Sequence, residues 1–293
     1  MSAIKHKNRG ASDEAIQHHY DVSNDFYFLW LDPTRTYSSA LWKEDENYED
    51  LEAAQLRKLD FHVEQARVKN AKRVLDVGCG WGSLLRRLVD VHGVEHTVGL
   101  TLSKAQLESV ATLNHPKIEV RLESWTEHFP TEPYDGIISI GAFEHFARLE
   151  LRPEEKVEAY RTFFRRCHEL LKPGSWMSLQ TIVYENSENK DLSQFFAEQV
   201  FPESDLPRQS EIFTAADRVF EIIAFRNNRE HYARTLKAWL KRLKANRTMA
   251  VNLVGEEEVA RYEKYLSLSI ISMHTGATNL SVIALRRLDN PRK

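Results

Sequence analysis

The segment from Val74 to Gly82 constrains the fold of this 293-residue chain more than any other stretch. Its apolar beginning ends in an acid, Asp76, and three closely spaced glycines follow: Gly78, Gly80 and Gly82. The next residues, 83–89, place apolar side chains at helical spacing. This order predicts a strand, a tight glycine turn and the start of a helix. Glycines in such a turn let the backbone approach a nucleotide-like ligand closely.

The chemistry around this turn narrows the class of ligand. The spacing Gly78-x-Gly80-x-Gly82 differs from the dinucleotide pattern G-x-G-x-x-G, and no Gly-Lys-Ser/Thr follows to hold a triphosphate. The carboxylate of Asp76 would repel a phosphate, but it suits an ammonium group such as the one at the methionine end of S-adenosylmethionine. The turn therefore predicts an S-adenosylmethionine site that contains Asp76 and the three glycines.

The composition excludes several classes of function. The 40 basic and 43 acidic residues leave a net charge of −3, which is not the electrostatic signature of a nucleic-acid-binding protein. Two cysteines, Cys79 and Cys167, lie far apart and indicate a reducing compartment without a disulfide framework. No segment resembles a signal peptide, and no apolar run approaches the roughly 20 residues of a membrane span. We expect a cytoplasmic protein with no transmembrane segment and no metal site.

A cluster of basic residues stands out on one predicted helix near the C-terminus. Its members are Lys237, Lys241, Arg242, Lys244 and Arg247. The cluster has two interpretations, a solvated helix face or a peripheral landing patch for an anionic carrier protein or membrane surface. The sequence does not indicate an oligomeric state.

Alternating strand and helix patterns predict an α/β fold with a doubly wound, mostly parallel sheet. The predicted strands cover residues 73–77, 95–100, 117–122, 135–140, 176–183, 219–225 and 279–286. The predicted helices cover residues 13–31, 48–68, 82–92, 103–112, 155–171, 229–246 and 255–272. Lys172-Pro173-Gly174 is expected to stop the helix before it. The predicted parts of the chain are an N-terminal helical cap (1–70), a Rossmann-like cofactor-binding core (71–183), an inserted helical lid (184–218) and a C-terminal completion of the sheet with helices (219–293).

Two groups of apolar and aromatic residues could enclose the ligands. The N-terminal group could close over a sulfonium, because an aromatic face attracts a cation by ~0.5–2 kcal/mol. The group in the predicted lid could line an acceptor pocket and exclude water. For both groups, ordinary core packing is the alternative. The groups are Tyr20, Phe26, Tyr27, Trp30 and Tyr37 at the N-terminus, and Phe195, Phe196, Val200 and Phe201 in the lid.

The ends of the second and third predicted strands carry polar groups suited to a nucleoside. Thr101 stands where many nucleoside-binding folds place an acid, so Thr101 and Gln106 are expected to hold ribose or adenine. Ser103 and Gln106 also fit a helix capping box, a role compatible with binding. Ser124 and Trp125 follow the third strand, where Trp125 either walls the adenine or packs in the core.

The fourth predicted strand ends at Ile140 and Gly141, shortly before Glu144 and His145. A carboxylate and an imidazole projected over the cofactor could orient a base or an anion. The alternative is structural, with Glu144 capping a helix and His145 packing on the surface.

The chain resembles the cyclopropane fatty acid synthase and mycolic acid cyclopropane synthase family, S-adenosylmethionine-dependent enzymes with Rossmann-like class I methyltransferase domains. The resemblance covers roughly residues 17–287, and its motifs occur in the family's order. They are residues 19–27, 31–33, 36–38, 75–82, 99–103, 141–146, 201–202, 206–207 and 231–236. The resemblance implies that the cofactor site is lined by Tyr37, Ser38, Gly78, Thr101, Leu102, Gln106 and Trp125. Ser124, after the third predicted strand, and Ile140, at the end of the fourth, complete the predicted cofactor site.

In this family, methyl transfer to an alkene carbon produces a carbocation, and a bound bicarbonate then removes a proton so that the ring closes. The resemblance assigns bicarbonate contacts to Glu144, to Tyr232 and to two positions that differ here, where Ser39 replaces a cysteine and Gln180 replaces a histidine. A third difference is Met273-His274 in place of a Phe-Arg pair. Serine and glutamine still donate hydrogen bonds to an oxyanion, but glutamine carries no charge. These replacements leave open whether bicarbonate binds.

The sequence therefore predicts an enzyme that transfers a methyl group from S-adenosylmethionine to an apolar or partly apolar acceptor. The acceptor is a small molecule or an acyl chain, either free or bound to a carrier. The candidate catalytic residues are Glu144, Tyr232, His145, Ser39 and Gln180. One alternative is a true cyclopropane synthase that acts on unsaturated acyl chains with bicarbonate as the base. The other is a catalytically inactive cofactor-binding partner protein.

Overall fold

The structure is a computed structural model that describes residues 10–12, 17, 22–43, 49–191 and 203–290. Seven strands form one sheet in the order β3-β2-β1-β4-β5-β7-β6. The strands are β1 (Arg73–Val77), β2 (His96–Thr101), β3 (Ile118–Leu122), β4 (Tyr134–Ile140), β5 (Leu171–Tyr184), β6 (Phe220–Asn227) and β7 (Thr278–Arg287). β1 to β5 pair in parallel, and β7 runs antiparallel between β5 and β6. The predicted doubly wound, mostly parallel α/β fold is confirmed.

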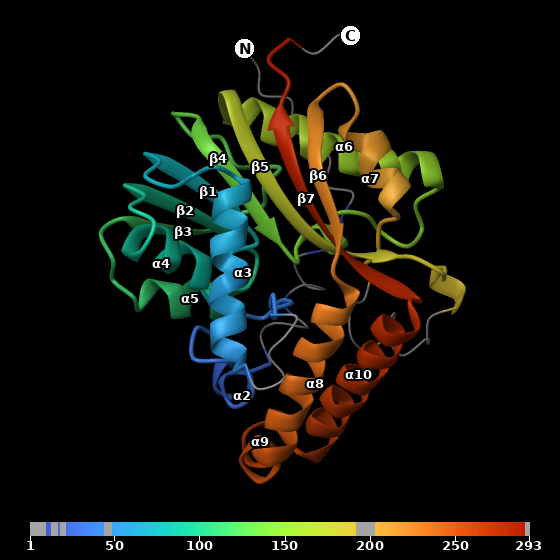
Figure 1. Ribbon diagram of the computed structural model, residues 1–293. Coiled ribbons are helices and arrows are strands. Elements are labelled where there is room, and N and C mark those ends of the chain that lie inside the picture. Colours follow the sequence, from blue (N-terminus) through green and yellow to red (C-terminus); the bar gives the residue numbers. More distant parts are fainter. Residues whose placement is uncertain (1–9, 13–16, 18–21, 44–48, 192–202, 291–293) are drawn as a thin grey trace.

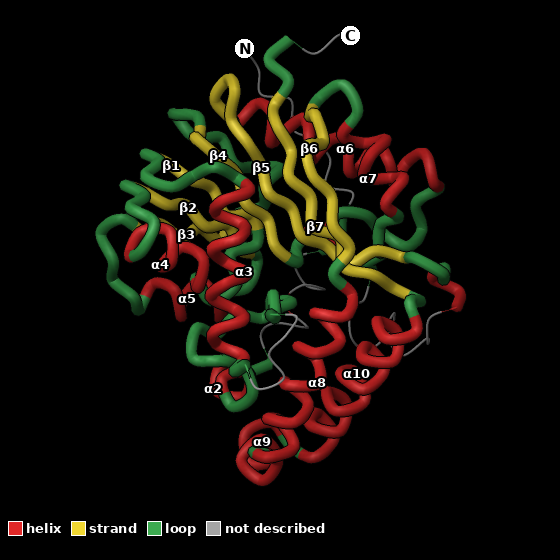
Figure 2. The backbone as a smooth tube through the Cα atoms, in the orientation of Figure 1, coloured by secondary structure: helices red, strands yellow, loops and turns green. Residues whose placement is uncertain are grey.

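Helices cover both faces of the sheet, as Figures 1 and 2 show. They are α2 (Asn24–Phe28), α3 (Leu51–Gln65), α4 (Ser83–Asp90), α5 (Lys104–Ala111), α6 (Pro153–Leu170), α7 (Gln209–Ala216), α8 (Arg229–Ala245), α9 (Arg247–Val254) and α10 (Glu256–Thr275). Two 3₁₀ turns, η1 (Phe143–His145) and η2 (Asn189–Asp191), complete the described elements.

Alternating side chains of β1 explain how the two faces are filled. Val74 packs with α3 and α4, whereas Leu75 and Val77 join the cluster around α6. Successive strand residues point to opposite faces, so Asp76 lies on the same face as Val74 and α3. In β5, Leu179 packs on the α6 side, which places Gln180 on the α3 side.

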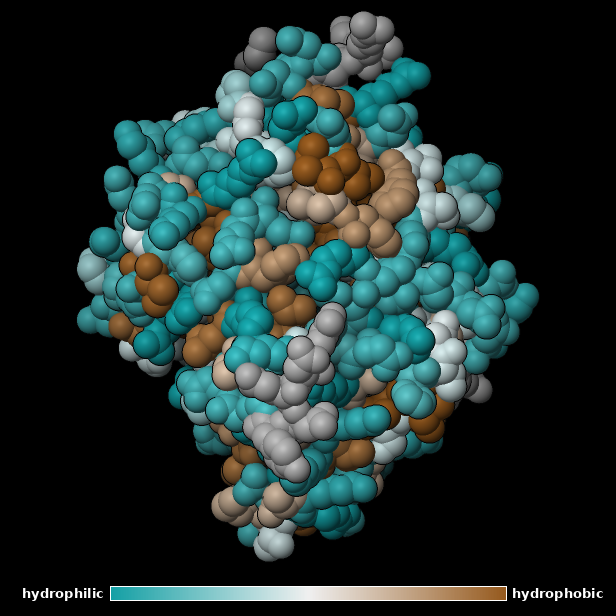
Figure 3. Space-filling view, in the orientation of Figure 1, coloured by the Kyte–Doolittle hydropathy of each residue, from teal (hydrophilic) through white to brown (hydrophobic). Residues whose placement is uncertain are grey.

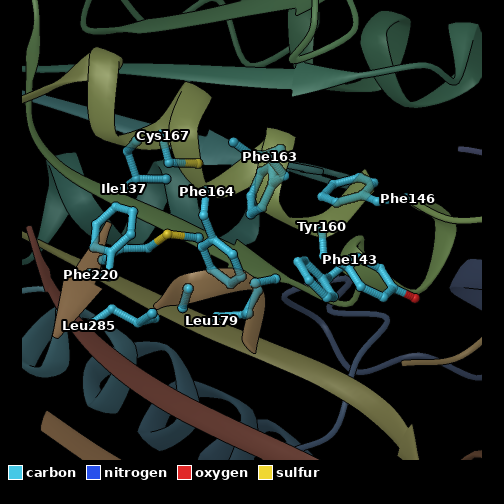
Figure 4. Close-up of a cluster of buried hydrophobic side chains, with 14 of the residues drawn as sticks. Ile137, Phe143, Phe146, Tyr160, Phe163, Phe164, Cys167, Leu179, Phe220 and Leu285 are labelled. Atoms are coloured by element: carbon cyan, nitrogen blue, oxygen red, sulfur yellow. The ribbon is translucent and has the colours of Figure 1, made fainter. Parts of the chain in front are cut away.

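The core between the sheet and α6 is strongly aromatic (Figure 4). Phe143, Tyr160, Phe163 and Phe164 are all fully buried there. The rings of Phe143 and Tyr160 stack with their centroids 4.5 Å apart, and Phe143 meets Phe163 edge-on at 5.6 Å. Because Phe143 opens the turn that carries Glu144, this core fixes the position of that turn.

A helical layer formed by α8, α9 and α10 lies beyond the carboxyl ends of the parallel strands (Figure 1). Its core includes Trp30 and Trp239, which are fully buried and meet edge-on with their centroids 5.8 Å apart. The hydroxyls of Tyr27 and Tyr262 join this core to α10 through a hydrogen bond of 2.6 Å. Tyr232 on α8 is buried in the same cluster.

The predicted boundaries are only partly confirmed. Helix α6 ends at Leu170, so Lys172-Pro173-Gly174 follows its end as predicted, but β5 begins at Leu171 and not at residue 176, so this tripeptide lies inside the start of the strand. Gly174 has a φ of +75°, and around it the pairing of β5 with β4 shifts register between Leu171 and Trp176. The predicted helices 229–246 and 255–272 are present as α8 and α10, and α9, which was not predicted, stands between them. In residues 13–31, the described part holds only the short α2 and the single helical residue Gln17.

The predicted lid falls partly outside the described residues. Phe195, Phe196, Val200 and Phe201 lie there, as does Tyr20 of the N-terminal group. After this stretch the chain forms α7, which packs against α6 and β6. This helix falls within the predicted helical lid (184–218), although no helix was predicted at its own bounds.

The surface seen in Figure 3 is mostly hydrophilic, with small separate apolar areas. No described helix is both long and apolar enough to cross a membrane. Of the basic cluster, Lys237, Lys241 and Lys244 are exposed along α8, Arg242 is half-buried, and Arg247 belongs to α9.

Candidate active site

A cavity opens at the carboxyl ends of β1, β2 and β4, where the strand order reverses between β1 and β4. It encloses about 1070 Å³, counting its open mouth. Eleven of the residues predicted for the cofactor line it: Tyr37, Ser38, Asp76, Gly78, Gly80, Thr101, Leu102, Gln106, Ser124, Trp125 and Ile140. Of the predicted catalytic residues, His145 alone lines this cavity.

The glycine turn has the geometry that a close ligand requires. Gly78 has a φ of +83°, and a Cβ there would lie 2.5 Å from Cβ of Ala142. Gly80 has a φ of +53°, and a Cβ there would meet no atom within 4 Å, so this glycine borders open space. Gly82 does not line the cavity, contrary to the prediction. It starts α4 with a φ of +82° and packs against Val110, so its requirement for glycine is structural.

Thr101 and Gln106 form a polar wall of the cavity. The Thr101 hydroxyl donates a hydrogen bond of 2.7 Å to Oε1 of Gln106. Ser103 caps α5 and accepts a hydrogen bond of 3.1 Å from the backbone N–H of Gln106. The predicted capping box is therefore only half formed, since the Gln106 side chain bonds to Thr101 instead of the helix backbone.

Trp125 lines the cavity and also packs in the core. Its ring lies 5.3 Å from that of Phe146 and 5.2 Å from that of Phe163. The two interpretations of this tryptophan are therefore compatible. Beside it, the Ser124 hydroxyl is hydrogen bonded to the hydroxyl of Thr126 at 2.9 Å.

Lys58 is a wall residue that sequence reasoning missed. It lies on α3, is only 2% exposed, and its Nζ donates a hydrogen bond of 2.7 Å to the Ser38 hydroxyl. Burial lowers the pKa of Lys58, and burial raises the pKa of Asp76 on the facing strand. The attraction between the two charges opposes both shifts. The cavity thus holds one buried cationic and one buried anionic group.

The signal for Lys58 was present in the sequence, because α3 buries a polar stripe. Gln55, Lys58, His62 and Gln65 recur at spacings of three and four, so they share one helix face. Gln55 donates a hydrogen bond of 2.8 Å to the carbonyl of Ser38. Polar residues at positions where an amphipathic helix normally places apolar ones point to a site.

Glu144 is held with one carboxylate oxygen free of protein partners. Its Oε1 accepts a hydrogen bond of 2.7 Å from the backbone N–H of Ile182. Its Oε2 is buried with no hydrogen-bond partner within the part of the chain that the structure describes. Burial raises the pKa of Glu144 to about 7. The structural alternative for Glu144 is wrong, because the residue lies inside η1 and caps no helix.

His145 is half-buried at the cavity wall. Its Nδ1 lies 2.7 Å from the Ser204 hydroxyl, and burial lowers its pKa to about 4, which keeps the imidazole neutral. His145 thus lies partly at the surface and partly at the cavity wall, so both interpretations remain open for it.

Like Glu144, the other three predicted catalytic residues do not line the cavity. Tyr232 lies in the aromatic cluster, 6.1 Å from the ring of Trp239. Ser39 is buried, with 1% of the residue exposed, and its hydroxyl donates a hydrogen bond of 3.1 Å to the carbonyl of Ala40. Gln180 is buried on the α3 face, with its Oε1 3.2 Å from Nε2 of His62.

A second missed residue, His62, explains the orientation of Gln180. His62 is fully buried, and its Nδ1 lies 2.7 Å from the hydroxyl of Ser178. Burial lowers its pKa to about 3, so the ring is neutral. Its contact with the amide oxygen leaves the amide nitrogen of Gln180 as a donor for other groups.

Tyr37 connects the cavity to the aromatic cluster behind it. It lines the cavity, and its hydroxyl donates to the hydroxyl of Tyr265 at 3.2 Å. Burial raises the pKa of Tyr265, and the Glu144 carboxylate raises it further. By contrast, Phe26, Tyr27 and Trp30 are fully buried in the cluster and do not line the cavity. The predicted contact with a ligand therefore remains possible for Tyr37 alone among the described residues of the N-terminal aromatic group.

Comparison with known proteins identifies the family. The model of the mycolic acid cyclopropane synthetase family matches residues 6–283. The chain belongs to this family. Cyclopropane mycolic acid synthase 3 of Mycobacterium tuberculosis is 34% identical over 290 residues, which cover 93% of this chain and 96% of the relative. The S-adenosylmethionine-dependent methyltransferase UmaA of the same species is 33% identical, and the match covers 94% and 97% of the two chains.

A solved structure agrees with this assignment. The crystal structure of mycolic acid cyclopropane synthase CmaA1 complexed with SAH and CTAB superposes with a TM-score of 0.85 at 33% identity. The match covers 95% of this chain and 99% of that chain. Membership confirms the fold class, the family and the enzyme class expected from sequence, that of S-adenosylmethionine-dependent methyltransferases.

The described residues are not arranged to hold a metal. Within the described ranges, no three or more His, Cys, Asp or Glu side chains form a group that could bind one.

Proposed function

We propose that this member of the family transfers a methyl group from S-adenosylmethionine to an unsaturated or otherwise apolar acyl chain. The observation that carries the proposal is the pairing of the glycine-lined cavity with Glu144, a buried carboxylate with an unpartnered oxygen at the end of the adjoining strand. The long alkyl chain of the CTAB in the CmaA1 complex supports an apolar acceptor.

The residues of the cavity fit the proposed cofactor. Gly80 leaves open space beside the backbone, while Thr101 and Gln106 offer hydroxyl and amide groups for the ribose or adenine. The buried Asp76 suits an ammonium group. When bound, S-adenosylmethionine supplies an electrophilic methyl group on a positively charged sulphur. Trp125, Leu102 and Ile140 provide apolar wall that keeps water away.

Glu144 is suited to the proton step that must follow transfer to an alkene carbon. The new carbon–carbon bond uses the alkene electron pair and leaves a cation on the acceptor chain. Loss of a neighbouring proton to Oε2 of Glu144 returns an electron pair to the chain and neutralises it. A pKa of about 7 lets the carboxylate act as a base at neutral pH.

The alternative outcome is ring closure with bicarbonate as the base. The contact between His62 and Gln180 supports this alternative. His62 occupies the amide oxygen of Gln180, so the amide nitrogen can donate a hydrogen bond to a bicarbonate ion. Ser39 is less suited as an anion ligand in the present arrangement, since its hydroxyl donates to the carbonyl of Ala40. We favour simple methyl transfer on this ground.

The test uses cofactor labelled in its methyl group and a panel of acceptors, from free unsaturated fatty acids to carrier-bound and phospholipid-bound chains. The proposal predicts labelled product and S-adenosylhomocysteine with at least one apolar acceptor. Proton NMR separates the two outcomes, because cyclopropane protons resonate upfield of methyl protons. Absence of S-adenosylhomocysteine with every acceptor class would refute methyl transfer. Bicarbonate-dependent formation of a cyclopropane would replace it with ring synthesis.

A further inference from the structure

We propose that Lys58 binds the carboxylate of the cofactor's amino-acid end, opposite an ammonium site at Asp76. This inference rests on the proposed cofactor and deepens it, because it makes recognition of a zwitterion the basis of selectivity. It assigns a direct ligand contact to a helix outside the glycine turn.

Lys58 lies at the wall of the predicted cofactor cavity. Lys58 lines the same cavity as Asp76 and Ser38, although it comes from α3 and they come from β1 and the loop after α2. Its hydrogen bond to the Ser38 hydroxyl holds Nζ at the cavity wall. A 2% exposed lysine is unusual, since lysines are almost never fully buried unless they are paired.

The protein does not supply that pair. Within the described part of the chain, no carboxylate lies within 4.0 Å of Nζ of Lys58. Asp32 faces Lys58 electrostatically, but its carboxylate accepts hydrogen bonds from the backbone N–H groups of Thr34 and Thr36 at 2.9 and 3.3 Å. The neighbouring loop therefore already uses both oxygens of Asp32. The remaining hydrogen-bonding capacity of Nζ is available to a ligand.

Asp76 is in the complementary situation. It lines the cavity at 2% exposure, and burial and Lys58 are the two influences on its pKa. No described group donates a hydrogen bond to its carboxylate. Burying a charge without a hydrogen-bonded partner of opposite charge is costly, so a ligand that supplies such a partner to Lys58 and to Asp76 is favoured.

An amino-acid end meets both needs at once. Its carboxylate would accept from Nζ of Lys58, and its ammonium would donate to Asp76. Each contact is a charge-assisted hydrogen bond in a water-poor site, where such bonds are strong. A ligand with only one of the two charges would leave the other protein group unpaired. The cavity therefore selects a zwitterion over a cation or a neutral nucleoside.

Binding of three ligands tests the inference without requiring turnover. They are S-adenosylmethionine, its decarboxylated analogue, which keeps the sulfonium and the amine, and 5′-methylthioadenosine, which lacks the amino-acid end. Calorimetric Kd values are measured for the wild-type chain and for Lys58→Met, which keeps the length of the side chain and removes its charge. We expect the wild-type chain to bind S-adenosylmethionine about 10- to 100-fold more tightly than the decarboxylated analogue, the range of one charge-assisted hydrogen bond.

In Lys58→Met this preference should fall to about threefold or less, while the Kd of 5′-methylthioadenosine stays within about threefold of wild type. Lys58→Arg, which keeps the charge, should retain most of the preference. Lys156→Met is the matched control, because Lys156 is also buried but pairs with Asp205 at 2.6 Å and does not line the cavity. That variant should lose stability and keep the wild-type preference.

Two results would overturn the inference. One is a wild-type chain that binds the decarboxylated analogue as tightly as S-adenosylmethionine, a readout that needs no variant to fold. The other is a Lys58→Met variant that weakens all three ligands equally, which would make Lys58 a support for Ser38 only. Failure of the wild-type chain to bind any of the three ligands would instead refute the proposed function.

Discussion

Replacing Glu144 by glutamine removes a titrating group while keeping its shape. The amide oxygen of glutamine can still accept the hydrogen bond from Ile182, so the turn that carries the residue should keep its position. The buried, unpartnered Oε2 becomes an amide nitrogen that cannot take up a proton. The variant therefore separates the role of Glu144 as a base from its role in packing.

The pKa of Glu144 sets the size and sign of the effect on stability. Burial raises this pKa from 4.5 to about 7, so the folded chain holds the proton more tightly than the unfolded chain between these values. The stability that the protonated carboxyl contributes is complete below pH 4.5 and is lost as the pH rises through 7. Between pH 5 and pH 8 the wild-type chain should lose about 2 to 3 kcal/mol that Glu144→Gln does not lose, at 1.36 kcal/mol for each pH unit of difference.

Urea unfolding of both chains at pH 5 and pH 8 measures this difference, with Glu64→Gln, a change at an exposed position of α3, as the control. The stability of Glu144→Gln relative to wild type should rise with pH by about 2 to 3 kcal/mol, and that of the control should not change. Methyl transfer should fall about 10²- to 10⁴-fold, and the wild-type rate should rise with pH through about 7. A difference in stability that is the same at both pH values would contradict the raised pKa of Glu144, and full activity of the variant would contradict its role as a base.

Three further predictions concern the turn and the residues behind the cavity. Gly78→Ala should lower the free energy of unfolding by about 1–3 kcal/mol, because its Cβ would lie 2.5 Å from Cβ of Ala142. Gly80→Ala should lower it less but weaken cofactor binding, since its Cβ would enter the open space of the cavity. Urea unfolding measures the first effect and calorimetry with the cofactor measures the second. Tyr232→Phe should lower kcat without changing the Kd of S-adenosylmethionine, because Tyr232 lies outside the cavity, and an altered Kd would count against this placement. Gln180→His should raise turnover in the presence of bicarbonate only if the enzyme closes a ring, so an unchanged rate in this assay supports simple methyl transfer.

The sequence predicted the part of the fold that depends on local patterns. Val74 to Gly82 encodes the strand, the turn and the helix start within nine residues, and β1 has the predicted bounds. The N-cap at Ser103 was likewise readable, because its partner is only three residues away. Lys172-Pro173-Gly174 was also readable as the stop of the preceding helix, since α6 ends at Leu170. The early start of β5 was not readable, because Leu171 pairs with Tyr134 before a register shift, and regular pairing with β4 and β7 begins only at Trp176, the predicted start. Such an irregularity depends on the partner strand and leaves no local signal.

The candidate site was harder to predict from the sequence, because it depends on contacts between segments that are distant along the chain. Lys58 and Asp76 are 18 positions apart and meet only because α3 crosses the sheet face to which Asp76 points. His62 and Gln180 are 118 positions apart. Neither pair leaves a periodic signal that links its members. The polar stripe of α3 was visible, but its meaning required knowing what it faces.

We propose that the first β–α junction binds a zwitterionic sulfonium cofactor. Isothermal titration calorimetry of the purified chain with S-adenosylmethionine and with S-adenosylhomocysteine measures this binding. We expect saturable heat with one site per chain for both ligands and a raised Tm in their presence. No heat and no thermal shift with either ligand would contradict it.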